Sequence, residues 1–259
     1  MWNLLEKTIR RVGGGGEGRT KGARMRAIDV PFYVTAVAEA SERVLSTADG
    51  LDDAAVALPS TLPGWNRAMV LTHLARNADG AAGVLAGARR GEAVLLYPHG
   101  QEGRAADIEA GRDRGASALL ADLHMSVDGL AASYAAMREA DWMFESRWQA
   151  GTFPVWQLLP SRWREVEVHH LDLDLGYGPT DWPDSFVRSE LTEAVTELPS
   201  RLPHGTSVRL VASDGPGEWR AGATGSQPVV VAAPACELLA WLFGRPSSVV
   251  DAPEIASWH

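Results

Sequence analysis

The stretch from Arg162 to Tyr177, RWREVEVHHLDLDLGY, constrains the fold more than any other part of the chain. It carries two glutamates and two histidines within six residues, and such side chains can bind a divalent metal. Glu165 and His169 stand four residues apart, so on a helix they share a face and are separated by about 40° of rotation. A metal site built on this pair needs a further ligand from elsewhere in the chain.

A second pair in the same stretch competes with the first. Glu167 and His170 are three residues apart, and this spacing also places two side chains on one helix face. Glu167 lies about 200° around the helix from Glu165, so only one pair can face a site squarely. Spacing alone allows either pair. Glutamate and histidine at such spacings are also common as solvated or hydrogen-bonded residues that bind no metal.

The composition limits the class of protein. The chain has 259 residues, of which 46% are hydrophobic, and this is enough to bury a sizeable core. A formal net charge of -9 argues against a nucleic-acid partner, which usually needs a basic face. Cys236 is the only cysteine, so an intrachain disulfide and a cysteine-based metal site are excluded.

The sequence also bears on location. No apolar run approaches the ~20 residues that cross a bilayer, and the N-terminus lacks the pattern of a signal peptide. We therefore expect no membrane partner and a cytoplasmic location. Residues 1–27 contain four consecutive glycines and scattered basic residues. Such a segment cannot offset its ordering entropy by burial, so we expect a disordered N-terminal extension.

Four helices are expected between residues 28 and 176, because apolar residues recur there at helical spacing. Their ranges are 30–48, 66–90, 105–140 and 154–175. The third range contains no proline, and either one long helix or two helices broken near Gly115 fit it. We expect residues 91–103 to form a loop. Four helices joined by short and medium loops favour a four-helix bundle.

The pattern changes after Gly176. Trp182 and Pro183 precede an expected helix at 184–202, and strand-like runs follow at 207–213, 217–223 and 227–233. A last helix is expected at 235–243. This order predicts a small α+β domain at 177–259, packed on a bundle at 28–176. The fold class is therefore a two-domain α+β protein.

His73 is the candidate third ligand. Trp65, Met69 and His73 follow one another at four-residue steps, so His73 points the same way as apolar residues that should face the bundle interior. A histidine on one helix and a glutamate–histidine pair on another, all directed inward, is the usual way to build a metal site in a bundle. A buried, hydrogen-bonded histidine without a metal is the alternative.

Four segments resemble the mycothiol-dependent maleylpyruvate isomerase family, in the same order along the chain. They are LPGWNRAMVLTHLARNADG (62–80), YPHGQEGRAADIEAG (97–111), REVEVHHLDLDLGYGPTDWPDSFV (164–187) and ELLAWLFGRPS (237–247). The resemblance implies a DinB-like metal-binding four-helix bundle in the N-terminal domain. This chain has YPHG where the family often has a YPGG-like turn, so His99 stands in place of a glycine.

The resemblance also implies the site residues. Carried over position by position, the zinc ligands of the family fall on His73, Glu165 and His169, which chooses between the two rival pairs. Glu167 and His170 are then neighbours of the ligands. An essential arginine in the smaller C-terminal domain of the family falls on Arg245, over a shorter matching segment. A helix C-terminal arginine that binds the last carbonyls is the alternative interpretation of Arg245.

The implied activity is cis–trans isomerisation of enoyl diacids such as maleylpyruvate. The family uses a divalent metal, zinc, and the low-molecular-weight thiol mycothiol, whose metal-bound thiolate adds reversibly to the C=C bond. The partners of the protein are then a small-molecule substrate and a thiol cosubstrate. Two alternatives remain open: an S-transferase that adds mycothiol or a related thiol to an electrophile, and a non-catalytic metal- or thiol-binding protein.

Overall fold

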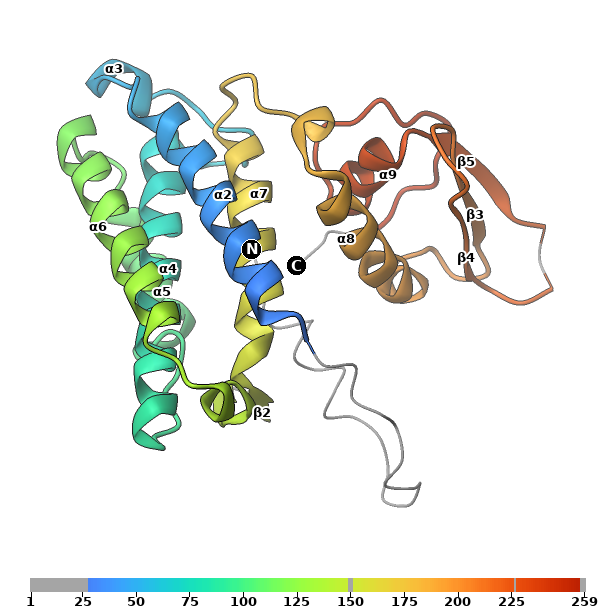
Figure 1. Cartoon of the computed structure of the whole chain (residues 1–259). Coiled ribbons are helices and arrows are strands. Elements are labelled where there is room, and N and C mark those ends of the chain that lie inside the picture. The colour runs from blue at the N-terminus through green and yellow to red at the C-terminus, as the bar shows by residue number, and fades with distance from the viewer. Residues whose placement is uncertain (1–27, 149–150, 226, 257–259) are drawn as a thin grey trace. The chain divides into compact units, whose positions relative to one another are not determined.

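The computed structural model describes residues 28–148, 151–225 and 227–256. Four long helices form the first part of the described chain (Figure 1). They are α2 (Val30–Ala48), α4 (Arg67–Arg90), α6 (Ala116–Ala135) and α7 (Leu158–Asp172). Helices α2 and α4 each pack against both α6 and α7, so the four form a closed ring around one core. The predicted bundle is confirmed.

Local chemistry explains where these helices begin and end. The Asp29 carboxylate accepts a hydrogen bond from the backbone amide of Phe32 at 3.0 Å and so caps α2. Asn66 caps α4 in the same way, through the amide of Met69 at 3.0 Å. Helix α4 ends at Gly91, whose φ of 72° is a left-handed conformation that glycine adopts without strain.

The expected third helix, 105–140, is two helices. Helix α5 spans Gly100–Glu109 and α6 spans Ala116–Ala135, so the alternative with a break near Gly115 is the correct one. The loop expected at 91–103 is too long, because its last residues already belong to α5. Gly100 takes a φ of 68° and supplies the left-handed turn, which allows His99 to precede the helix with an ordinary φ of -95°. A single turn, α3 (Asp53–Val56), precedes α4.

Helix α7 is buried on every side. It follows a short 3₁₀ segment, η2 (Val155–Gln157), and Pro160 fits because it stands in the first turn, where its missing amide hydrogen is not needed. Every other residue of α7 is buried. A helix surrounded in this way has no solvent face, so hydrophobic periodicity does not reveal which of its faces meets which neighbour.

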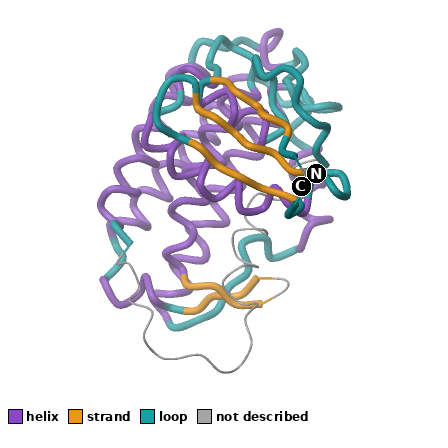
Figure 2. Tube along the Cα trace, turned by 90° about the vertical axis from the view of Figure 1, so that its right-hand side faces the viewer, coloured by secondary structure: helices purple, strands orange, loops and turns teal. Residues whose placement is uncertain are grey.

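A hairpin before α7 was not expected from the sequence. Strands β1 (Glu145–Trp148) and β2 (Gly151–Pro154) pair antiparallel, with Ser146 opposite Phe153 (Figure 2). They follow the 3₁₀ segment η1 (Glu139–Met143). The Ser146 hydroxyl donates to the carbonyl of Val94 at 2.9 Å, which ties the hairpin to the segment after α4. Strands of four residues are too short to show a clear alternating pattern in a sequence.

The C-terminal part is the predicted α+β unit. Strand order is β4–β3–β5, with β3 (Ser207–Ala212) antiparallel to β4 (Glu218–Gly222) and parallel to β5 (Val229–Ala233). Helices α8 (Asp184–Glu197) and α9 (Ala235–Leu242) pack on each other and on the sheet, and both lie on one side of it in Figure 1. Two 3₁₀ turns, η3 (Pro179–Asp181) and η4 (Leu198–Ser200), flank α8. The α+β fold class is confirmed.

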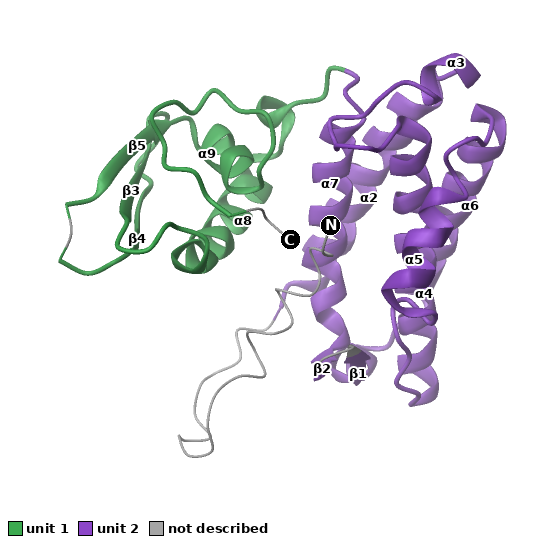
Figure 3. Cartoon of the chain, turned by 180° about the vertical axis from the view of Figure 1, so that it is seen from behind, with its two compact units in different colours: residues 1–2, 176–259 green, residues 3–175 purple. Residues whose placement is uncertain are grey.

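The chain divides into two compact units between Leu175 and Gly176 (Figure 3). The first unit holds the bundle and the hairpin, and the second holds the small sheet and its helices. The assignment of domains to 28–176 and 177–259 stays a prediction. The extension predicted at 1–27 lies outside the described residues. No helix in the described part of the chain has the length and apolar character needed to cross a membrane.

Candidate metal centre

Three predicted ligands meet inside the bundle. His73 comes from α4, and Glu165 and His169 come from α7, with one potential ligand atom of each residue lying within 4.8 Å of the others. The Nε2 atom of His73 is 2.8 Å from Oε2 of Glu165, and the Nε2 atom of His169 is 3.5 Å from the same oxygen. All three residues are buried, with exposed fractions of 0%, 1% and 5%. Within the described residues, this is the one such cluster of metal-ligating side chains.

Two arginines fix α4 and α7 against each other on either side of the cluster. Arg67, in the first turn of α4, donates to the carbonyls of Leu173 at 2.7 Å and Asp174 at 2.8 Å, just beyond the C-terminal end of α7. Arg162, in α7, donates to the carbonyl of Leu74 at 3.0 Å. These hydrogen bonds hold His73 of α4 at a fixed distance from Glu165 and His169 of α7, and they do not depend on a bound metal.

The inward direction predicted for His73 is correct. Its imidazole packs edge-on against the Trp65 ring, with centroids 5.9 Å apart, and Met69 between them in sequence is buried. The His73 and His169 rings also meet edge-on at 4.5 Å. These apolar and aromatic contacts fix the plane of the His73 ring, which a ligand needs before the metal arrives.

The carboxylate of Asp172 orients His169. Its Oδ2 atom is 2.8 Å from the Nδ1 atom of His169, while Oδ1 accepts a hydrogen bond from the Thr61 hydroxyl at 2.7 Å. A carboxylate beside Nδ1 holds a ring proton there, so Nε2 is the nitrogen that can lose its proton and bind a metal. Sequence reasoning missed Asp172, although its position three residues after His169 places it on the same helix face.

The rival pair, Glu167 and His170, faces α2. An oxygen of Glu167 accepts a hydrogen bond from the Arg43 guanidinium at 2.5 Å and from the Trp163 indole at 3.0 Å. The Nε2 atom of His170 is hydrogen-bonded to the Thr47 hydroxyl at 2.8 Å. No third metal-ligating side chain joins this pair in the described part of the chain. The structure therefore assembles the cluster around Glu165 and His169.

The pKa shifts of His73 and Glu165 favour binding of a cation, whereas that of His169 favours a bound proton. Burial lowers the pKa of His73 to about 3, and the nearby Arg104 guanidinium acts in the same direction, so this imidazole is neutral. Burial alone would raise the pKa of Glu165, but the two imidazoles outweigh it and hold that pKa well below its usual value. Burial would lower the pKa of His169, yet the carboxylates of Asp172 and Glu165 raise it.

The donor set fits a divalent metal. The Oε1 atom of Glu165 is buried and has no hydrogen-bond partner, which is costly for a carboxylate unless a cation completes its coordination. Two imidazoles and one carboxylate make up a common three-ligand set for zinc, with a fourth position open to water or substrate. Thr61 and Trp65, which contact Asp172 and His73, line a pocket of about 900 Å³, whereas none of the three clustered side chains lines it.

Sequence reasoning also missed Arg104, on α5. One of its terminal nitrogens, Nη2, lies 3.2 Å from Nδ1 of His73, and its guanidinium lies over the Tyr97 ring, 5.4 Å from the centroid. The Tyr97 hydroxyl is 3.2 Å from the side-chain amide of Asn77, whose oxygen accepts a hydrogen bond from Arg162 at 2.7 Å. A chain of polar contacts thus runs from Arg162 to the metal-ligand cluster.

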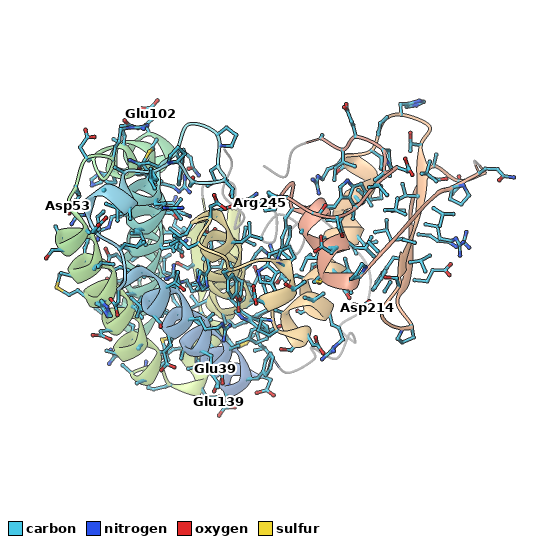
Figure 4. The ribbon with its side chains drawn as sticks, turned by 90° about the horizontal axis from the view of Figure 1, so that it is seen from above. Glu39, Asp53, Glu102, Glu139, Asp214 and Arg245 are labelled. Carbon is cyan, nitrogen blue, oxygen red and sulfur yellow. The ribbon has the colours of Figure 1, made fainter. Side chains whose placement is uncertain are left out.

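Arg245 belongs to the C-terminal unit and follows the end of α9 (Figure 4). Its backbone amide donates to the carbonyl of Ala240 and its Nη1 atom to the carbonyl of Phe243, both at 2.9 Å. These contacts match the alternative interpretation of a helix C-terminal arginine. Its assignment as a catalytic residue stays a prediction.

We expect Asp172→Asn to weaken zinc binding about 10- to 100-fold at pH 8, the usual cost of losing a partner of a metal-ligating histidine. In the native protein the raised pKa of His169 makes protons compete with the metal, so affinity should fall about tenfold per pH unit below that pKa. Asparagine lowers this pKa, so the fall should begin at lower pH in the variant. Competition titrations with a chelator between about pH 5.5 and 8 measure both effects. An unchanged pH profile would contradict the role of Asp172.

Comparisons with known proteins identify the family and the fold. Residues 37–174 match the family model described as the mycothiol maleylpyruvate isomerase N-terminal domain. Two solved structures, the mycothiol-dependent maleylpyruvate isomerase and a single-residue variant of it, superpose with a TM-score of 0.81 and 24% sequence identity. Each alignment covers 89% of this chain and 98% of the other chain. No curated protein sequence matches the chain.

Proposed function

The chain belongs to the mycothiol maleylpyruvate isomerase family, since its N-terminal domain matches over residues 37–174, and from this premise we propose that it is a metal- and thiol-dependent cis–trans isomerase. Its substrates are enoyl diacids of the maleylpyruvate type, and its cosubstrate is mycothiol or a related low-molecular-weight thiol. The observation that carries this proposal is the buried cluster of His73, Glu165 and His169. The two solved isomerase structures support the same fold over most of the chain.

In this proposal the three clustered side chains hold a divalent metal, and zinc suits two imidazoles and one carboxylate best. When bound, the metal lowers the pKa of an entering thiol, and the resulting nucleophile can add to a C=C bond and leave again after rotation. The protein can therefore perform thiol chemistry with Cys236 as its only cysteine.

The residues of the chain supply binding and orientation. Glu165 remains ionised and offers its unpartnered Oε1 atom to a cation. Asp172 keeps the proton of His169 on Nδ1, so that Nε2 is available as a ligand. Burial of the cluster limits access of bulk water, which strengthens the interaction of these groups with a metal.

We assign Arg245 to the substrate or to negative charge that develops on it, because a planar guanidinium binds a carboxylate or an enolate with two parallel donors. The support for this assignment is the resemblance of the WLFGR segment to the family. We also propose a cytoplasmic location, because the reaction needs a reduced thiol and reducing conditions prevail in that compartment.

The test separates an isomerase from an S-transferase that uses the same site. Purified, zinc-loaded protein is incubated with maleylpyruvate, with and without mycothiol, and the products are analysed by mass spectrometry. We expect a product of unchanged mass and trans configuration, formed only when the thiol is present. A product heavier by the mass of the thiol would show transfer instead, and absence of any thiol-dependent product would refute both activities.

A further inference from the structure

Arg104 differs from several other arginines of the first unit. Several of these form ion pairs with carboxylates: Arg76 and Arg114 with Asp122, Arg112 with Glu109, and Arg138 with Asp141. Among the described residues, Arg104 contacts no carboxylate, and its polar contacts are the neutral His73 ring and Tyr97. A cation beside a metal-ligand cluster, without an acid of its own, is suited to an anion that comes from outside the chain.

The edge of the Arg104 guanidinium that can bind such an anion is formed by Nε and Nη2. These two N–H groups point in parallel and together can bind both oxygens of a carboxylate. In Arg104, Nη2 is occupied by the His73 ring, whereas Nε is buried and has no hydrogen-bond partner. An unpartnered buried donor costs about 1–3 kcal/mol, so this edge gains from an acceptor with two oxygens.

The contact with His73 is compatible with only one protonation pattern. A guanidinium can only donate, so Nδ1 of His73 accepts and Nε2 carries the ring proton towards Glu165. If Nε2 instead binds a metal, the ring proton belongs on Nδ1, where it faces the Arg104 donor. Loading of the cluster therefore releases Nη2, so that it and the already unpartnered Nε can bind another acceptor.

Arg104 is also held in place from its other side. Tyr97 lies beneath the guanidinium and is itself buried and anchored by Asn77, which Arg162 holds in turn. A guanidinium that rests on an aromatic ring keeps its plane while it exchanges one acceptor for another. The cation is thus positioned before a ligand binds, which reduces the entropy lost on binding.

We propose that Arg104 is the carboxylate-binding residue of the metal centre, and that Nε and Nη2 hold one carboxylate of a diacid substrate next to the metal. This proposal deepens the proposed function, on which it rests for the diacid as substrate. The proposal explains why the positively charged Arg104 lies beside His73, although its charge repels a metal ion bound there. Arg104 acts by binding the substrate, and the residues beneath it act by positioning Arg104.

The test measures binding of maleate, a simple cis diacid, to the zinc-loaded protein by isothermal titration calorimetry. We expect Arg104→Met to weaken maleate binding about tenfold or more, since a charge-assisted pair of hydrogen bonds is lost. Arg104→Lys should give an intermediate affinity, because it keeps the charge without the planar pair of donors. Arg76→Met is the matched control: it removes an arginine that is paired with Asp122, and maleate affinity should not change.

The zinc affinity of Arg104→Met is a second measurement, and it distinguishes a substrate-binding role of Arg104 from a structural role. Removal of a cation from beside His73 should leave zinc affinity unchanged or increase it, whereas loss of a structural support should decrease it. The proposal is overturned if Arg104→Met binds maleate as the wild type does, if the wild type does not bind maleate, or if zinc and maleate affinities fall together. Arg104-dependent maleate binding without conversion of maleylpyruvate would refute the proposed isomerase and support the carboxylate site.

Discussion

Glu165→Gln should lower zinc affinity by at least about 100-fold, and His73→Ala and His169→Ala should do the same. Loss of a residue that merely orients a metal ligand already costs about 10- to 100-fold in affinity, so loss of a ligand itself costs more. Glutamine keeps the size of Glu165 but removes the charge that a cation needs in a buried site. Thiol-dependent turnover should disappear with the metal. Elemental analysis of the purified variants and chelator competition measure the first effect, and the maleylpyruvate assay measures the second.

Glu167→Gln is the matched control for this prediction. Glu167 lies on the same helix and is equally buried, with an exposed fraction of 1%, but it accepts hydrogen bonds from Arg43 and Trp163. Its replacement should destabilise the contact between α2 and α7 and leave bound zinc at the wild-type level. Circular dichroism checks that each variant keeps its helices. Stoichiometric zinc in Glu165→Gln, or equal loss of zinc in both variants, would contradict the assignment of the ligands.

Arg245→Ala should keep the metal and lower kcat/KM by about 100-fold, because removing a donor that stabilises charge in a transition state typically costs about that much. The expected loss is in the rate, since the metal ligands lie in the other unit of the chain. Steady-state kinetics with maleylpyruvate and mycothiol, together with zinc analysis of the same preparations, measure the two quantities separately.

Arg209→Ala controls for a general effect of removing an arginine from the C-terminal unit. Arg209 lies on β3 and pairs with Glu218 across the strands, at 3.2 Å, so its replacement should change kcat/KM little. The alternative interpretation of Arg245 predicts a different result. If its only task is to bind the carbonyl of Phe243 after α9, Arg245→Ala should lower thermal stability slightly and leave kcat/KM at the wild-type level.

Most elements of the fold follow from local patterns in the sequence. The apolar spacing predicts α2 and α4, and the β-branched runs predict the three strands of the C-terminal sheet within two residues of their ends. The elements that the sequence did not predict are short segments. Strands β1 and β2 have four residues each, and α5 is a helix of 10 residues that begins at Gly100, so none of the three produces a periodic signal long enough to recognise.

For the candidate site too, the sequence predicts relations within one helix but not the polar partners of the ligands. Spacing within one helix places Glu165 near His169, and steps of four residues place His73 in line with Trp65 and Met69. These relations depend only on helix geometry, which the covalent chain fixes. The partners Asp172 and Arg104 were not assigned a role, because whether a polar side chain is a partner or a solvated residue depends on what packs against it.

The sequence by itself determined that two glutamate–histidine pairs lie on one helix, and its resemblance to a family chose Glu165 and His169 between them. Tertiary structure decided what each pair meets: His73, distant in the chain, lies 2.8 Å from Glu165, while Glu167 and His170 contact Arg43 and Thr47 of α2. The physical reason is the burial of α7 on all sides, which leaves no solvent face in the pattern of its residues. Only the packing of α2 and α4 around that helix distinguishes a metal-ligand cluster from a set of interhelical hydrogen bonds.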